Sequence, residues 1–189
     1  MTQPSPGAKP APTTRTHLRK ILLDQRRNAV AAQRQLWDEQ ITAKVIDWCR
    51  QQRPVSLGVY WPIQAEPDLR CCYPTLQELG IQLALPLVQN KAQALTFLAW
   101  APGDNMATDE YGIPVPAQRQ RIIQPAALLI PCVGFNTYNY RLGYGGGYYD
   151  RTLSITPRPL AIGIAYRQGQ ADFAAQAHDQ AMDLIITDE

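Results

Sequence analysis

The sequence predicts an α/β fold with a mainly parallel sheet, helices on both faces and a long N-terminal helical segment. Residues 15–52 contain no proline or glycine, and their apolar side chains recur mostly at helical spacing. Beyond residue 52, short apolar runs that suit buried strands alternate with segments that suit helices. Such alternation is typical of a parallel sheet with a layer of helices on each face.

The expected elements can be placed along the chain in order. Residues 15–52 form one long helix or two, a helix over 67–79 has proline near its first turn, and another covers 148–155. Short runs rich in Val, Ile, Leu and Ala predict buried strands at 55–60, 81–88, 94–100, 126–131, 160–166 and 184–187.

Length and composition fit one globular domain preceded by a tail. Of the 189 residues 46% are hydrophobic and 18% charged, which is enough apolar material for a substantial core. Residues 1–14 carry four prolines among small polar residues, and we expect a disordered tail there. This tail lacks the charged-then-apolar pattern of a secretory signal. With one lysine and no acid it leaves a transit peptide open, although it lacks the arginine-rich amphipathic character of one. Residues 15–189 are then a single α/β domain.

Charge and cysteine content argue against several function classes. The net charge is +2 without any lysine or arginine run, which argues against nucleic-acid binding. No apolar run approaches the roughly 20 residues that span a bilayer, so we expect no membrane partner. The four cysteines form no C-x-x-C pair, which argues against zinc and favours reduced thiols in the cytoplasm.

Residues 141–151, with the sequence RLGYGGGYYDR, are the most informative segment. Four glycines within five positions let the backbone turn several N–H groups toward an anion. Arg141 offers a fork for phosphate oxygens and Asp150 a hard carboxylate for Mg²⁺. An expected strand precedes the run and an expected helix follows it, which is the usual order for phosphate binding. Taken alone, the run fits a tight connection between packed elements equally well, and neither standard nucleotide fingerprint matches it.

The same residues carry a family resemblance. Residues 129–136 and 141–151 resemble the signature of the 5-formyltetrahydrofolate cyclo-ligases, also called methenyltetrahydrofolate synthetases. Supporting stretches occur in the family's order from about residue 15 to the C-terminus: Arg15-x-x-x-Arg19, Tyr60-Trp61-Pro62 followed by Glu66, Leu85-Pro86-Leu87-Val88, Tyr111-Gly112-Ile113-Pro114 and His178-Asp179-x-x-x-Asp183. The glycine block is specific, and the other stretches support it.

The resemblance implies a set of site residues. Arg141 and Tyr148 are the expected catalytic residues, and Mg²⁺ is assigned to Asp150 and Asp179. The implied ATP contacts are Arg15, Arg19, Arg141, Leu142, Gly143, Tyr144, Gly145, Gly146, Gly147, Tyr148 and Tyr149. The implied folate contacts are Trp61, Glu66, Tyr111 and Tyr148.

Elementary chemistry supports these assignments and leaves alternatives open. Arg15 and Arg19 share a helix face and can reach one anion, or they are two solvated charges; the family carries lysine where Arg15 stands, which keeps the charge but changes the geometry. Glu66 suits the donor groups of a pterin ring, or it is a charge at a helix start. Asp179 either holds a metal or terminates a turn, and Tyr111 either packs on the folate or on the protein.

The implied reaction converts 5-formyltetrahydrofolate into 5,10-methenyltetrahydrofolate, with release of ADP and phosphate. Transfer of the γ-phosphoryl group to the formyl oxygen gives an iminium phosphate, from which phosphate leaves after ring closure. Such a transfer needs alignment and charge neutralisation rather than a covalent enzyme intermediate. The expected partners are the folate, with or without a polyglutamate tail, and Mg²⁺ with ATP; we expect a monomer.

Two departures from the family pattern and two rival functions remain. Asn136 stands where the family commonly has aspartate, and Asn139 where it commonly has glycine. Loss of the carboxylate at Asn136 either weakens a contact or exchanges one loop hydrogen bond for another. Asn139 tolerates a left-handed backbone, so these departures concern the level of activity more than the fold. The rivals are a non-catalytic folate-binding or regulatory protein and an ATP-dependent kinase or ligase that acts on another acyl substrate.

Overall fold

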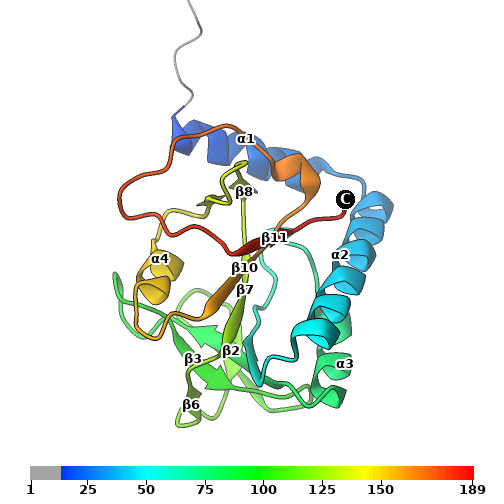
Figure 1. The fold of residues 1–189 in the computed structure, drawn as a ribbon, viewed down its shortest axis with the longest axis vertical. Helices are drawn as coiled ribbons and strands as arrows, with labels where there is room; N and C mark the ends of the chain where they lie inside the picture. Colours follow the sequence, from blue (N-terminus) through cyan, green and yellow to red (C-terminus); the bar gives the residue numbers. More distant parts are fainter. Residues whose placement is uncertain (1–13) are drawn as a thin grey trace, which may run out of the picture.

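The computed structural model describes residues 14–189 (Figure 1). The predicted tail, apart from its last residue, lies outside the described residues. The Thr14 hydroxyl caps helix α1 (Arg15–Asn28) by accepting a hydrogen bond from the His17 N–H at 3.3 Å. Such a cap satisfies one of the free N–H groups at a helix start, so α1 begins directly after Thr14.

Within residues 14–189, seven strands form one mostly parallel sheet. Their order across it is β11-β10-β7-β1-β2-β3-β6. The strands are β1 (Ser56–Gly58), β2 (Gln82–Leu87), β3 (Thr96–Ala99), β6 (Ile122–Ile123), β7 (Ala127–Pro131), β10 (Leu160–Ile164) and β11 (Leu184–Ile186). The pairs from β11 to β2 are parallel, and β3 pairs antiparallel with both β2 and β6. The predicted α/β fold is confirmed.

Alternating side chains of the strands build a core on each face of the sheet. Leu83, Leu85 and Leu129 belong to the core that packs with α2 (Ala31–Gln52) and α3 (Tyr73–Glu78). Their strand neighbours face the opposite way, into a second core where α4 (Tyr148–Leu153) contributes Leu153; the strand residues of that core include Ala84, Phe97, Leu128, Ile130 and Ala161. Figure 1 shows α2 and α3 on one side of the sheet and α4 on the other. The predicted helices on both faces are therefore present.

The N-terminal helical segment is divided into α1 and α2. Ala29 and Val30 between them have extended backbones, with ψ of 136° and 134°. The break turns α1 across the end of the sheet, where Leu22 packs against Val133, just beyond the carboxyl end of β7. Helix α1 thereby lies over the edge at which parallel α/β sheets bind their ligands (Figure 1).

The predicted helix over 67–79 is shorter in the structure. A 3-10 turn, η1 (Arg70–Cys72), precedes α3, which starts at Tyr73. Pro74 explains the late start, because proline lacks an N–H and fits only the first turn of a helix. The expected strands and the helix over 148–155 are present with slightly shorter bounds than predicted.

Two hairpins of the described residues have no counterpart among the predicted elements. β4 (Met106–Thr108) pairs with β5 (Pro114–Pro116), and β8 (Gly134–Phe135) pairs with β9 (Arg141–Leu142). A short 3-10 helix, η2 (Arg167–Gly169), follows β10. The first hairpin carries Tyr111 in its turn, and the second delivers Arg141 to the start of the glycine run.

No helix of residues 14–189 is long and apolar enough to cross a membrane.

Candidate active site

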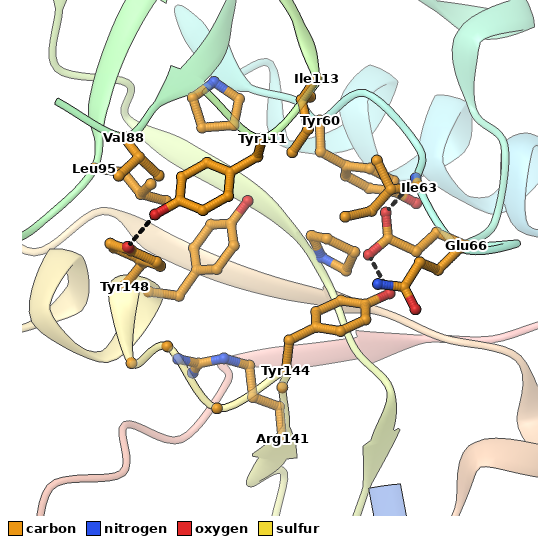
Figure 2. Close-up of a pocket in the computed structure, with 18 of the residues that line it drawn as sticks. Tyr60, Ile63, Glu66, Val88, Leu95, Tyr111, Ile113, Arg141, Tyr144 and Tyr148 are labelled. Atoms are coloured by element: carbon orange, nitrogen blue, oxygen red, sulfur yellow. Dashed lines mark hydrogen bonds between the residues drawn. The ribbon is translucent and has the colours of Figure 1, made fainter. Parts of the chain in front are cut away.

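A cavity of about 640 Å³ collects the predicted site residues (Figure 2). Its walls come from α1, the loop after β1, the β4–β5 turn, the glycine run with α4, and the segment 176–179. The predicted residues that line it are Arg15, Arg19, Trp61, Glu66, Tyr111, Arg141, Gly143, Tyr144, Gly145, Gly146, Gly147, Tyr148, Tyr149, Asp150 and Asp179. Leu142 does not line it, because its side chain is buried beside Leu22 and Val133. Strand alternation turns Leu142 away from the neighbouring Arg141 and Gly143.

The glycine run forms a curved loop between β9 and α4. Gly145 has a φ of +99° and Gly147 a φ of +65°, a region that favours glycine. A Cβ on Gly146 would lie 2.8 Å from the Tyr148 ring. Arg19 donates from Nε to the Gly143 carbonyl at 2.7 Å, and its guanidinium carbon lies 3.7 Å from where a Gly145 Cβ would be. A cation is thus held directly against the glycine loop.

Arginine and aspartate side chains pair at this end of the cavity. Arg141 Nη2 lies 2.8 Å from Asp150 Oδ1, and Arg141 Nη1 donates to the Gln180 carbonyl. Arg15 binds both carboxylate oxygens of Asp179, at 2.6 and 3.2 Å. Burial raises the pKa of Asp179, but hydrogen bonds from Arg15 and the Gln176 N–H outweigh it and leave the pKa below its ordinary value.

The two carboxylates fit a magnesium ion that arrives with a nucleotide. Asp150 and Asp179 both line the cavity near the glycine loop. Residues 14–189 contain no group of three or more His, Cys, Asp or Glu side chains placed to hold a metal. Mg²⁺ commonly takes one or two carboxylates and completes its shell with phosphate oxygens and water. The donor set therefore suits Mg²⁺ bound with phosphates better than a metal held by protein alone.

Glu66 occupies the opposite end of the cavity and is only 4% exposed. Its Oε1 accepts from the Tyr144 hydroxyl at 2.8 Å, and its Oε2 accepts from the Ile63 N–H at 2.9 Å. Burial raises the pKa of Glu66 to about 7 although these bonds and the Arg26 charge oppose the shift. Gln64 and Ala65, just before it, have φ values of +48° and +59°. No helix starts at Glu66, so the alternative of a helix-start charge is wrong.

Aromatic side chains cover the space between the two ends. The hydroxyls of Tyr111 and Tyr148 lie 3.1 Å apart, and Figure 2 shows them pointing toward each other. Tyr111 is 50% exposed, so it covers the cavity from the β4–β5 turn instead of packing in the core. Trp61 packs edge-on against Trp100, with ring centroids 6.3 Å apart.

The residues that replace the family's aspartate and glycine have defined structural roles. Asn136 is buried; its amide oxygen accepts from the N–H groups of Tyr138 and Tyr140, and its amide nitrogen donates to the Phe173 carbonyl at 3.0 Å. An aspartate could accept those bonds but could not donate the last one. Asn139 has a φ of +60°, the left-handed backbone expected for it.

Sequence reasoning missed two arginines beside the site. Arg26, 3% exposed, donates to the Tyr144 hydroxyl and to the Cys132 carbonyl. A signal existed, because Arg26 continues the stripe of Leu18 and Leu22 at four-residue spacing. Arg151 lies over the Tyr148 ring and donates to the Gly146 and Gln93 carbonyls, so it holds the loop to its neighbours.

Similarity to known proteins agrees with this geometry. The model of the 5-formyltetrahydrofolate cyclo-ligase family matches residues 11–188. A 5-formyltetrahydrofolate cyclo-ligase of Mycolicibacterium smegmatis is 28% identical over 187 residues, which cover 94% of this chain and 95% of that protein. One of Mycoplasma pneumoniae is 56% identical over a shorter stretch of 62 residues, 32% of this chain and 38% of that protein.

A solved structure extends the likeness to the fold. The structure of a 5,10-methenyltetrahydrofolate synthetase from Mycoplasma pneumoniae superimposes with a TM-score of 0.75 and 30% sequence identity, covering 93% of this chain and 99% of that one. Together with the family match over nearly the whole chain, this shows that the protein belongs to the 5-formyltetrahydrofolate cyclo-ligase family, so the predicted family and cyclo-ligase activity are confirmed.

Proposed function

We propose that this chain converts 5-formyltetrahydrofolate and ATP into 5,10-methenyltetrahydrofolate, ADP and phosphate in the cavity described above. One observation carries the proposal: a single cavity joins a cationic glycine loop to a buried carboxylate. The loop suits a polyphosphate, and the carboxylate suits a ring that presents two N–H donors. The family is ATP-dependent, which fits the phosphate end.

ATP occupies the glycine-loop end in this proposal. The N–H groups of the loop and the guanidinium groups of Arg19, Arg141 and Arg15 surround its phosphates. Arg141, now paired with Asp150, would be free to bind phosphate oxygens if Asp150 held Mg²⁺ instead. Tyr148 starts α4 beside the loop and lies between the phosphates and the folate.

Asp150 and Asp179 would hold Mg²⁺. The ion, when bound, neutralises charge on the phosphate oxygens. The protein's own contribution is to keep both carboxylates close to the loop and the Asp179 carboxylate ionised. Asp179 does so through its paired arginine, which holds its pKa low after burial has raised it.

The folate occupies the other end. Glu66 accepts from the amino and ring N–H groups of the pterin, while Trp61, Tyr111 and Tyr148 contact the flat part of the substrate. Tyr111 covers this end from the β4–β5 turn and is itself half-exposed, so the cavity reaches solvent beside its ring. A glutamate or polyglutamate tail can leave through this opening.

The chemistry proceeds by activation of the formyl oxygen. That oxygen attacks the γ-phosphorus of ATP, ADP departs, and an iminium phosphate forms on N5. N10 then attacks the activated carbon and loses its proton, and the C–O bond breaks to release phosphate. Arg141 stabilises the charge that develops on the transferring phosphoryl group, and Tyr148 keeps the two substrates aligned.

The remaining expectations are also proposals. Residues 15–189 act as one catalytic domain, which the sheet supports because its strands run from residue 56 to residue 186. The four cysteines are free in the described residues, as expected of a cytoplasmic protein. A monomer is expected to sediment as a single 21.1 kDa species.

The test is a direct assay. Purified protein is mixed with 5-formyltetrahydrofolate, ATP and Mg²⁺, and the methenyl product is followed by its near-ultraviolet absorbance. We expect product that requires ATP, disappears with a chelator and disappears in Asp150→Asn. Asp47→Asn is the matched control, because Asp47 is an exposed aspartate of α2 that does not line the cavity.

The outcomes of this assay distinguish the candidate functions. Absence of product while calorimetry still detects folate binding would favour the non-catalytic binding protein. Full activity of Asp150→Asn would remove this residue from the proposed metal site and leave the reaction itself standing.

A further inference from the structure

We infer that Arg26 and Tyr144 are positioning residues that fix the Glu66 carboxylate for the folate ring. This inference rests on the proposed role of Glu66 in substrate binding. It assigns Tyr144 to the folate end of the cavity, although the glycine run that contains it serves the phosphates. Helix α1 would then contribute arginines to both the phosphate end and the folate end of the cavity.

The three side chains form a continuous hydrogen-bonded chain. Arg26 Nη2 donates to the Cys132 carbonyl at 2.6 Å, and its Nη1 donates to the Tyr144 hydroxyl at 3.1 Å. That hydroxyl donates to Glu66 Oε1 at 2.8 Å, a bond that Figure 2 draws beside the labelled carboxylate. Arg26 is 3% exposed and Glu66 4%, so the two ends of this chain are buried, while Tyr144 between them is 39% exposed and lines the cavity.

The direction of the chain is fixed by its chemistry. A guanidinium can only donate, so the Tyr144 oxygen must accept from Arg26. A tyrosine hydroxyl has a single hydrogen, which is then directed to Glu66. Glu66 Oε1 must therefore accept the hydrogen bond from Tyr144, and an ionised carboxylate is the best acceptor for it.

Each Glu66 oxygen receives one protein donor. Oε1 is held by Tyr144 and Oε2 by the Ile63 N–H at 2.9 Å. An ionised carboxylate accepts about four hydrogen bonds. The capacity that remains on each oxygen is available to a ligand in the cavity, and it matches a ring with two adjacent N–H donors.

A neighbouring arginine of α1 supports the same loop. Arg27 Nη2 donates to Gln64 Oε1 at 2.6 Å, and Gln64 lies in the positive-φ turn just before Glu66. Consecutive arginines of one helix thus hold the Glu66 side chain and the turn that precedes it. This pair is more exposed than that of Arg26, so Arg26 and Tyr144 make the sharper test.

The test uses Tyr144→Phe, which removes one hydroxyl and keeps the ring. A hydrogen bond to a charged group corresponds to a change of about tenfold or more, so we expect the folate KM to rise at least about tenfold. The ATP KM should change less than twofold. Tyr138→Phe is the matched control, because Tyr138 is 77% exposed and does not line the cavity.

A pH profile distinguishes positioning from loosened packing. The titratable or charged groups around Glu66 are Arg26 on α1, Tyr60 after β1, Cys132 after β7, Tyr144 in the glycine run and Tyr149 on α4. The Tyr144 bond lowers the pKa of Glu66, so its loss raises that pKa. The acid limb of kcat/KM for the folate should move to higher pH in Tyr144→Phe and stay in place in Tyr138→Phe.

Two further variants complete the test. Tyr144→Phe should add little in a Glu66→Gln background, because its effect acts through the Glu66 carboxylate. Arg26→Lys keeps the charge but cannot donate to both the Cys132 carbonyl and the Tyr144 hydroxyl in the same geometry. Like Tyr144→Phe, it should raise the folate KM more than the ATP KM, but by a smaller factor.

Each outcome has one meaning. An equal rise of both KM values, or an unchanged acid limb, in a Tyr144→Phe protein that melts like wild type would overturn the inference. If wild-type protein itself makes no methenyl product, the proposed function fails instead. If the wild type is active and Tyr144→Phe is indistinguishable from it, the inference alone fails.

Discussion

Arg141 and Asp150 are joined by an ion pair 2.8 Å long at the mouth of the glycine loop, with side chains 5% and 18% exposed. Both residues belong to the predicted ATP and metal machinery, and in this structure each neutralises the other. Such a pair keeps a cation and a carboxylate in the cavity without leaving either charge buried alone. In the proposed function, entry of a nucleotide with its metal ion would exchange these partners.

The exchange predicts a strong effect for Arg141→Lys. Lysine keeps the charge but cannot bind Asp150 and the Gln180 carbonyl together through a planar fork. Loss of one donor to the transferring phosphoryl group lowers kcat by about 100-fold or more. Steady-state assays of methenyl formation measure this, and Arg158→Lys, at another arginine–aspartate pair that does not line the cavity, is the control. Equal losses in both variants would contradict the role.

Glu66 predicts an unusual dependence of stability on pH. Its folded pKa of about 7 lies above the ordinary 4.5, so the group favours folding at low pH and this contribution is lost as the pH rises to about 7. A shift of this size corresponds to about 3 kcal/mol of unfolding free energy. Urea unfolding between pH 4 and 8 should therefore show Glu66→Gln gaining relative to wild type as the pH rises. A constant difference between the two proteins would mean that Glu66 keeps its ordinary pKa.

Gly147 predicts a defect confined to the nucleotide end. Its φ of +65° strains an alanine, and a Cβ there would lie 2.9 Å from Arg151 Nη1. Gly147→Ala should lose about 1 kcal/mol of stability and also raise the ATP KM. Gly80→Ala is a matched control with a φ of +81° and no atom within 4 Å, and it should lose stability without any change in KM. Equal ATP KM values in the two variants would argue against this loop as the phosphate site.

Tyr111 predicts a defect confined to the folate end. Removal of its ring in Tyr111→Ala takes away a wall of the cavity and should raise the folate KM about fivefold. Tyr111→Phe loses only the bond to the Tyr148 hydroxyl and should have a smaller effect. Both variants should leave the ATP KM and the melting temperature unchanged, as should the exposed control Tyr138→Ala. A larger change in the ATP KM than in the folate KM would place Tyr111 with the nucleotide.

The sequence predicted the sheet well because buried parallel strands consist of short apolar runs, such as residues 126–131. It predicted the start of α3 poorly, since both Pro67 and Pro74 suit the first turn of a helix and in the structure Pro74 occupies that place. The β4–β5 hairpin escaped detection because neither strand alternates clearly between apolar and polar residues.

The candidate site was likewise predicted only in part. The glycine run is a contiguous stretch of sequence, so the order and spacing of its residues could be recognised directly. The contact of Arg26 with Tyr144 joins residues 118 apart, and the Tyr144 contact with Glu66 joins residues 78 apart. No spacing rule connects such positions, so the partners of Glu66 became visible only when the chain was folded.

The contacts of helix α1 determine how much of the chain must be synthesised before the cavity is complete. Arg15 and Arg19, among the first described residues to leave the ribosome, find their partners at Gly143, Gln176 and Asp179. These contacts span between 124 and 164 positions of sequence. A chain that stops before residue 176 carries the glycine run and Glu66 but lacks Gln176 and Asp179, which line the cavity, so the site is complete only when this late segment has been made.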